Sequence, residues 1–335
     1  MFVKVGNMQR DSYFDNYKGL LIVTVLIGHF ISPLITKNHL ANFIETSIYT
    51  FHMPAFVFIS AYFSRKNSLV KLVKTLFIPY VIFQIIYFLF QMCLWHERPE
   101  FELFHPDFSL WFILSLFWWR LLISEVTKVK HILPILFILG ILVGFDTSVG
   151  TFLSLERTVY FFPFFLLGYR FDKEKFMRYA GKRSVQIAAA LLLVTVFTVV
   201  YFVCDHTTFD LFTAKYSYKK IGLPYWGWLH RAALYTLSTL LIYTIAVLIP
   251  RKKHWYSYLG YRTLSIYLLQ GLIYRTLQFS TNIYARLDSD KGVLLITLFA
   301  VVLTFVLSMK PFSYLVKLTT KIPVEKLLIH REDSQ

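Results

Sequence analysis

Charged residues are scarce in this chain. Of its 335 residues only 16% are charged, while 56% are hydrophobic and 19% are aromatic. A soluble domain carries about 25% charged residues. The composition therefore excludes an ordinary soluble enzyme and indicates an integral membrane protein, whose chemistry must come from membrane helices and their loops.

Several common catalytic signatures are also missing. The sequence has no glycine-rich phosphate loop, no serine at a nucleophile elbow and no run with metal-ligand spacing. This favours direct, base-assisted transfer without a covalent intermediate. The two cysteines, Cys93 and Cys204, both fall near the end of an apolar stretch on the predicted outer side. A disulfide and two buried free thiols are both consistent with that placement.

About ten stretches are long and apolar enough to form membrane-spanning helices. They lie near residues 18–36, 41–63, 72–95, 109–124, 132–149, 158–171, 185–204, 229–249, 263–283 and 292–309. We therefore predict an all-α, polytopic membrane helix bundle. The membrane domain covers residues 18–309, between an N-terminal segment over 1–17 and a C-terminal tail over 310–335.

Basic residues alternate between the connections of these stretches. The formal net charge is +16, and lysine and arginine concentrate in the two end segments and in every second connection. The positive-inside rule then places both ends in the cytoplasm. The basic loops are expected to face anionic lipid and an anionic cofactor, and no nucleic acid is expected as a partner.

A histidine lies in the first apolar stretch, where an ionisable side chain is costly and usually functional. His29 follows Lys18 by eleven residues. That spacing is about three helical turns, or roughly 16 Å, on one helix face. A neutral imidazole at His29 can take a proton from a hydroxyl nucleophile, or it can serve only in helix packing. Lys18 and its neighbour Asp15 can contact a phosphate-bearing donor or act as interfacial anchors.

The second stretch carries a second histidine, His52, at a similar predicted depth. Pro54 is expected to kink this helix and to free main-chain carbonyls. Two histidines at one depth favour a site, although packing also accounts for His52. Arg65 and Lys66 follow the stretch, and such a basic pair suits either the phosphates of coenzyme A or anionic lipid.

Polar residues also recur toward the predicted outer side. Tyr267, Gln270, Tyr274 and Gln278 form one stripe on a helix, which must face the bundle or a cavity. Further candidates for orienting an acceptor are Glu156, Arg157, Arg231 and Arg275. The connection over 205–228 is rich in Tyr and Trp, which can stack on sugar rings or form an interfacial aromatic belt.

The motifs together resemble a known family. Residues 10–19, followed by Gly28 and His29, resemble the opening of the acyltransferase-3 family of integral-membrane acyltransferases, and most closely its fucose 4-O-acetylase-like branch. Further similar segments follow in the family's order, at residues 51–54, 58–62, 79–80, 110–112, 161–169 and 264–270.

This resemblance implies an enzyme that takes an acyl group from cytoplasmic acyl-CoA, usually acetyl-CoA, and modifies a hydroxyl of an extracytoplasmic or lipid-linked sugar. Family members commonly pair an arginine with a histidine eleven residues later, and here Lys18 and His29 occupy these positions. A lysine replaces the planar fork with a point charge. Many relatives have a histidine where this chain has Gln270, so no proton transfer is expected there.

We therefore predict a multi-pass O-acetyltransferase of the cell membrane, with His29 as general base. The expected membrane is the bacterial plasma membrane. Lys18, Arg65 and Lys66 are expected to bind acetyl-CoA. The predicted substrate and cavity residues are Asp15, His52, Ser60, Glu156, Arg157 and Gln270. The expected partners are acyl-CoA, a capsular, exopolysaccharide or other envelope glycan, and membrane lipids, without a metal ion. Two alternatives remain: a glycan transporter or flippase with the histidines as proton relays, and an O-succinyltransferase.

Overall fold

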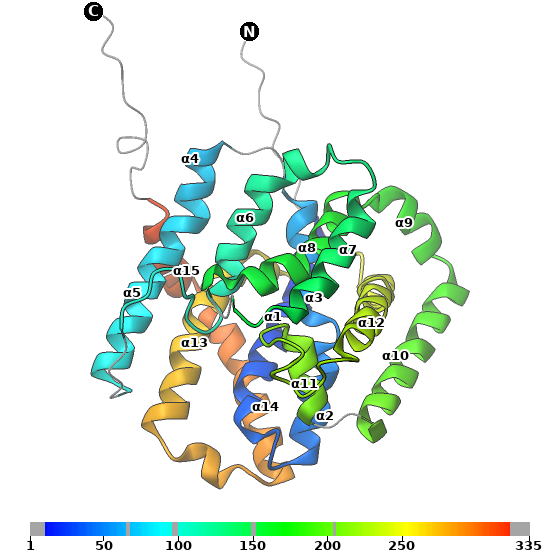
Figure 1. Cartoon of the computed structure of the whole chain (residues 1–335). Coiled ribbons are helices and arrows are strands. Elements are labelled where there is room, and N and C mark those ends of the chain that lie inside the picture. Colours follow the sequence, from blue (N-terminus) through cyan, green and yellow to red (C-terminus); the bar gives the residue numbers. More distant parts are fainter. Residues whose placement is uncertain (1–10, 65–67, 96–99, 149–151, 204–205, 322–335) are drawn as a thin grey trace, which may run out of the picture.

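The fold is a bundle of helices, seen in a computed structural model that describes residues 11–64, 68–95, 100–148, 152–203 and 206–321. No β-strand occurs in these ranges (Figure 1). The helices are α1 (Ser12–Ile31), α2 (His39–Tyr49), α3 (His52–Tyr62), α4 (Leu69–Leu72), α5 (Ile78–Cys93), α6 (Trp111–Val126), α7 (Ile132–Leu142), α8 (Leu155–Tyr169), α9 (Lys173–Ala180), α10 (Arg183–Val203), α11 (His206–Thr213), α12 (Gly227–Leu248), α13 (Thr263–Ser280), α14 (Asp290–Leu307) and α15 (Lys310–Thr319). A π-helical turn, η2 (Val73–Phe77), joins α4 to α5, and a 3₁₀ turn, η5 (Ser257–Tyr261), precedes α13.

Five helical segments in the described ranges are long and apolar enough to cross a membrane. They are Ser12–Leu34, Leu69–Cys93, Arg183–Val203, Gly227–Leu248 and Asp290–Leu307. The chain is therefore an all-helical, multi-pass membrane protein, as predicted. Other predicted spans are shorter helices: α8 has 15 residues, or about 22 Å, against about 30 Å of hydrocarbon. The count of ten crossings stays a prediction.

The first helix lies at the centre of the bundle. It packs against α2, α3, α13, α14 and η5 (Figure 1). Its start is fixed by Asp11, whose side chain accepts a hydrogen bond from the main-chain N–H of Tyr13 at 3.1 Å, an ordinary N-cap. We call the end of the bundle at which α1 begins the proximal end and the opposite end the distal end.

Two tyrosines fasten the proximal half of α1 to α12. The hydroxyl of Tyr13 donates to the carbonyl of Ala246 at 2.7 Å, and that of Tyr17 donates to the carbonyl of Ile242 at 2.9 Å. Both hydroxyls therefore satisfy main-chain groups of a neighbouring helix, which anchors helices in apolar surroundings.

Asn16 makes the most connections in this half of α1. It is fully buried. Its amide donates to the carbonyls of Pro250 and Lys252, each at 2.8 Å, and its oxygen accepts from the hydroxyl of Ser257. One side chain thus satisfies three polar groups of the connection between α12 and α13. This residue of the opening motif therefore holds α1 to that connection.

The second predicted stretch is interrupted, although Pro54 is not the cause. α2 ends at Tyr49 and α3 begins at His52. Pro54 lies in the first turn of α3, where its missing N–H costs nothing. The expected proline kink was therefore wrong in position. Side chains satisfy the carbonyls freed at the break: the His52 ring bonds to the carbonyl of Ile48 at 2.9 Å, and Ser238 of α12 donates to that of Thr50 at 2.7 Å.

The acidic connection between α5 and α6 runs back into the bundle beside α5. The amide of Gln84 donates to the carbonyls of Glu102 and His105, both at 3.0 Å, and accepts from the N–H of Asp107 at 3.1 Å. Gln91 donates to the Asp107 carboxylate at 2.9 Å. Two glutamines seven residues apart on one face of an apolar helix therefore hold a loop that would otherwise lie at the surface.

Candidate active site

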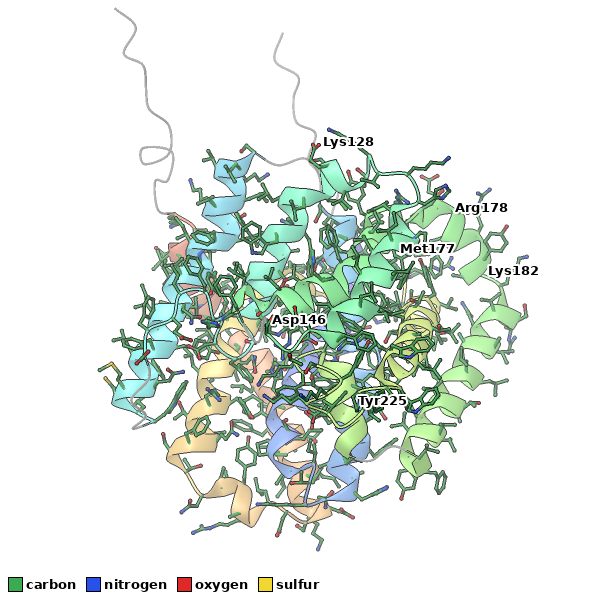
Figure 2. All side chains as sticks on the ribbon, in the orientation of Figure 1. Lys128, Asp146, Met177, Arg178, Lys182 and Tyr225 are labelled. Carbon is green, nitrogen blue, oxygen red and sulfur yellow. The ribbon has the colours of Figure 1, made fainter. Side chains whose placement is uncertain are left out.

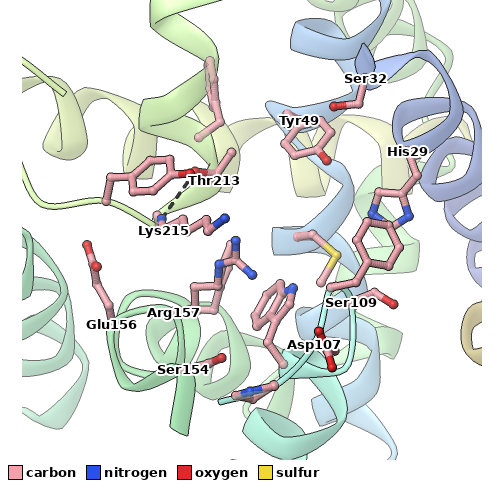
Figure 3. Close-up of a pocket in the computed structure, with 18 of the residues that line it drawn as sticks. His29, Ser32, Tyr49, Asp107, Ser109, Ser154, Glu156, Arg157, Thr213 and Lys215 are labelled. Atoms are coloured by element: carbon pink, nitrogen blue, oxygen red, sulfur yellow. Dashed lines mark hydrogen bonds between the residues drawn. The ribbon is translucent and has the colours of Figure 1, made fainter. Parts of the chain in front are cut away.

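A polar cavity of about 480 Å³ lies in the distal half of the bundle. Its walls come from α1, α2, α3, α8, α11 and α13 and from the connection between α5 and α6 (Figure 3). Four of the predicted site residues line it, namely His29, His52, Glu156 and Arg157. The fold therefore brings together side chains that lie up to 128 residues apart in the sequence, as a binding site requires.

His29 faces this cavity and has a specific partner. Its Nδ1 lies 3.2 Å from Oε1 of Gln270 on α13, and Gln270 is fully buried. With the amide oxygen as acceptor, Nδ1–H donates and Nε2 keeps its lone pair. Gln270 therefore does not need to transfer a proton to serve the site, because its geometry selects the tautomer in which His29 can act as a base.

The connection between α5 and α6 supplies the wall next to His29. The ring of Phe108 lies 4.7 Å from the His29 ring and stacks on Tyr274 at 5.0 Å, centroid to centroid. Phe108 has a φ of 41°, a left-handed conformation that is strained for a bulky residue. Tyr267 on α13 donates to the carbonyl of Ser109 and holds the loop in place. Sequence reasoning missed this wall; the paired glutamines on α5 were its only sign.

The break between α2 and α3 turns two further rings to the cavity. Tyr49 and His52 both line it, and their rings meet edge to face at 4.4 Å. The Nδ1–H of His52 donates to the carbonyl of Ile48 at 2.9 Å, so its Nε2 keeps its lone pair. An added Cβ at Gly28 would lie 3.2 Å from the Tyr49 ring. Gly28 therefore makes room for α2 next to His29.

Two adjacent residues of α8 differ sharply in their partners. Glu156 pairs with the buried Arg231 of α12 at 3.3 Å, and Arg231 also donates to the carbonyl of Gly140 at 3.3 Å. Arg157 stacks on the ring of Trp111 at 4.8 Å and makes no ion pair within the described part of the chain. Glu156 and Arg231 therefore engage each other, and both Glu156 and Arg157 line the cavity.

Comparison with known proteins decides the family. A model of the family described as "Acyltransferase domain", Acyl_transf_3, matches residues 11–310. The chain belongs to the acyltransferase-3 family. It is accordingly an acyltransferase, and membership implies an acyl donor and a carbohydrate or other acceptor. The predicted enzyme is confirmed at this level, and membership counts against the transporter alternative.

Two curated relatives share a short segment with this acyltransferase. Nodulation protein NolL of Mesorhizobium japonicum is 44% identical over 69 residues, or 20% of this chain and 18% of the relative. Nodulation protein NolL of Sinorhizobium fredii is 38% identical over 68 residues, or 19% and 18%. The match thus spans less than a fifth of each relative's length. No solved structure matches the chain significantly.

The family's opening motif also contains Lys18, which the fold places away from the cavity. Lys18 pairs with Asp15 at 3.2 Å and lies 4.8 Å above the ring of Phe63. Neither Lys18 nor Asp15 lines the cavity. Ser60 does not line it either, because it lies eight residues, or about 12 Å, along α3 from His52. Arg65 and Lys66 lie outside the described residues.

A further cation lies beside this proximal group. Arg120 of α6 is half-buried, and its Nε–H donates to the hydroxyl of Ser64 at 3.0 Å. Ser64 follows Phe63, so Lys18 and Arg120 both lie at the C-terminal end of α3. Arg120 is a charged residue near the middle of an apolar helix, and this pattern is a sequence signal for a candidate functional residue.

The aromatic residues of the connection before α12 separate into three groups. Tyr216 lines the cavity. Tyr218 is buried against the guanidinium of Arg231 at 4.7 Å. Tyr225 and Trp226 are exposed at the surface, with 80% and 64% of their areas accessible. The connection is therefore partly core, partly cavity wall and partly an exposed aromatic surface.

Proposed function

We propose that this acyltransferase transfers an acetyl group from acetyl-CoA to a hydroxyl of an envelope glycan, with His29 as general base. The observation that carries the proposal is the His29–Gln270 pair at the wall of a polar cavity. A histidine with one nitrogen held by a buried amide and the other free is arranged to accept a proton from a bound hydroxyl. We also propose that the protein lies in the bacterial plasma membrane and belongs to the fucose 4-O-acetylase-like branch of the family.

The reaction needs only one proton carrier. Nε2 of His29 takes the proton of the acceptor hydroxyl as the oxygen attacks the thioester carbonyl. The tetrahedral intermediate collapses, its C–S bond breaks, and the new ester forms. The imidazolium then returns the proton to the departing thiolate of coenzyme A, so that His29 is neutral again. A positioned base of this kind contributes about 10²–10⁴-fold in rate.

The donor is proposed to enter from the proximal end. Lys18 lies about 16 Å below His29 on α1, and Arg120 joins it at the end of α3. The exposed cations Lys128 and Arg178 also lie toward the proximal end of the bundle (Figure 2). This charge favours a cytoplasmic proximal end, where coenzyme A is available, and lets its phosphates meet cations.

The acceptor is proposed to reach the cavity from the distal half. The cavity is lined there by α11 and by Tyr216, and Tyr225 and Trp226 expose aromatic faces on the same connection. Aromatic faces beside polar groups suit sugar rings. A capsular, exopolysaccharide or other lipid-linked glycan is therefore the proposed acceptor class.

The test is transfer of labelled acetyl from acetyl-CoA to glycan in membranes that contain the full chain. His29→Ala should lower transfer by about 10²–10⁴-fold at unchanged protein levels. His230→Ala is the matched control, because His230 is exposed on α12 and should retain full activity. Unchanged transfer in His29→Ala would contradict the base assignment. Label that enters glycan only from succinyl-CoA would change the donor and retain the mechanism.

A further inference from the structure

Arg157 lines the cavity, and of the cations there its positive charge is the least compensated by the described residues. Its guanidinium lies over Trp111 at 4.8 Å, and the shielded Nε has no hydrogen-bond partner in the described residues. Figure 3 shows Arg157 extending into the cavity, with the His29 ring on the opposite side. A partly desolvated cation is costly unless an anion or a hydrogen-bond acceptor offsets it.

The nearby carboxylates are already engaged. Glu156 pairs with Arg231 at 3.3 Å, and Asp107 accepts from Gln91 at 2.9 Å. Glu102 lies 3.0 Å from the ring of His105. Asp210, the remaining carboxylate of the lining, is not free either. The acidic side chains of the cavity are therefore occupied by other groups.

The other cations of the cavity are placed differently. Arg275 lies among the rings of Phe279, Trp95 and Phe108, at 4.6, 5.4 and 5.9 Å. Lys215 is exposed and lies over Tyr216 at 5.1 Å. Three aromatic faces offset the charge of Arg275, and water solvates that of Lys215. Arg157, which contacts one ring and forms no ion pair with another described residue, is the cation best placed to meet a ligand.

We propose that Arg157 binds an anionic group of the acceptor, either the carboxylate of a uronic acid or a phosphate that links the glycan. The planar fork of a guanidinium matches either anion with two parallel hydrogen bonds. An anion held at Arg157 places a neighbouring sugar ring across the cavity, toward His29. This inference rests on the proposed transfer to a glycan and specifies the acceptor as an acidic one.

The experiment measures binding, so that it does not depend on catalysis. The full chain in lipid nanodiscs is titrated calorimetrically with a glucuronate-containing tetrasaccharide, with its carboxyl-reduced neutral counterpart, and with glucose 1-phosphate. We expect at least one anionic probe to bind at least tenfold more tightly than the neutral tetrasaccharide. Preference for the uronate assigns the anion to the sugar itself, and preference for the phosphate assigns it to a phosphate linkage.

Variants then place the anion at Arg157. Arg157→Gln should remove the preference for the anionic probe, and Arg157→Lys should keep part of it. Lys219→Gln removes an equal charge from an exposed position and should change affinity by less than about twofold. Equal affinity of the unaltered protein for anionic and neutral probes would overturn the proposal, and this comparison needs no variant to fold.

The same titration in His29→Ala separates this inference from the proposed function. An intact anion preference in that variant, together with lost transfer, supports both. A wild-type protein that acetylates neutral glycan and shows no anion preference would leave the function in place and refute the acidic acceptor. An anion preference that survives Arg157→Gln would also refute the role of Arg157.

Discussion

The two halves of α1 use their polar residues differently. In the proximal half, Tyr13, Asn16 and Tyr17 direct their polar atoms at main-chain groups of α12 and of the connection that follows it. Asn16 alone donates hydrogen bonds to two carbonyls and accepts one from the hydroxyl of Ser257. Each of these three side chains has its partners inside the protein, so none of the three is left to bind a ligand.

Around the distal half of α1, several polar side chains lack part of their hydrogen-bond partners. His29 has a partner for one ring nitrogen, and the amide nitrogen of Gln270 has none in the described residues. Across the cavity, Nε of Arg157 is also without a partner. Buried polar groups are normally satisfied, and groups that are not require an explanation.

The comparison shows how to distinguish buried polar residues that hold the helices together from those that are candidates for catalysis, on α1 and on the helices packed against it. Burial alone does not, because Asn16 and Gln270 are both fully buried. The remaining hydrogen-bonding capacity does separate them. Substitutions of the anchoring residues Tyr13, Asn16 and Tyr17 should therefore act on stability, and those of His29 and Gln270 should act on turnover.

The largest expected effect is on the stability of the proximal half. Asn16→Ala leaves two carbonyls and the Ser257 hydroxyl without their partner, and each such group costs about 1–3 kcal/mol. We expect a loss of about 3 kcal/mol in the free energy of unfolding, because water reaches part of this end of the bundle. The loss should appear as a lower unfolding temperature in scanning fluorimetry of the detergent-purified protein.

Asn282→Ala is the matched control for that substitution. Asn282 is exposed on the distal side, and a surface change of this kind alters stability by at most about 0.5 kcal/mol. The turnover of Asn16→Ala per folded molecule should stay near that of the unaltered protein. A large loss of turnover at unchanged stability would show that the proximal half takes part in catalysis.

The next effect concerns the orientation of the base. Gln270→Leu removes the acceptor for Nδ1–H of His29, so the ring loses its preferred tautomer and direction. Loss of a residue that orients a functional histidine typically costs about 10–100-fold in activity. We therefore expect kcat to fall by about 10–100-fold, with little change in KM for acetyl-CoA. The measurement is initial-rate kinetics with varied acetyl-CoA and a fixed glycan acceptor.

Rescue distinguishes positioning from packing at this position. Gln270→Glu and Gln270→His both restore a hydrogen-bonding group opposite Nδ1 and should recover more activity than Gln270→Leu. All three proteins should unfold at similar temperatures if the role is positioning. Equal kcat in the leucine and glutamate variants would refute the orienting role of Gln270.

Much of this division was visible in the sequence. The spacing of Lys18 and His29 predicted one helix with a cation below a base, and α1 has that form. The polar stripe on α13 predicted side chains that face the interior, and Tyr267, Tyr274 and Arg275 do line the cavity. Helical periodicity is a local property, so a sequence can report it.

The walls of the cavity were not predictable in the same way. At the break at Thr50 and Phe51, the carbonyl of Thr50 accepts a hydrogen bond from Ser238, 188 residues away. The inward path of the loop that carries Phe108 depends on Gln84 and on helix α13, which lie in other parts of the chain. Such features arise from tertiary contacts, and neither composition nor periodicity records them.

The smallest expected effect concerns donor binding at the proximal end. Lys18 is partly exposed and shares its charge with Asp15 at 3.2 Å, so its attraction for a phosphate is screened by solvent. We expect Lys18→Ala to raise KM for acetyl-CoA by about three- to fivefold, with kcat nearly unchanged. Lys18→Arg should lower KM, since a guanidinium can contact a phosphate with two hydrogen bonds.

Arg120 sharpens this last prediction, because it lies at the same end of α3. If both cations bind the donor, Arg120→Gln should also raise KM, and the double variant should raise it by less than the product of the single effects when one phosphate is shared. Salt should weaken donor binding in the unaltered protein more than in the double variant. A fall in kcat at constant KM in Lys18→Ala would instead place Lys18 with the distal, catalytic groups, and the division of α1 into two halves would no longer hold.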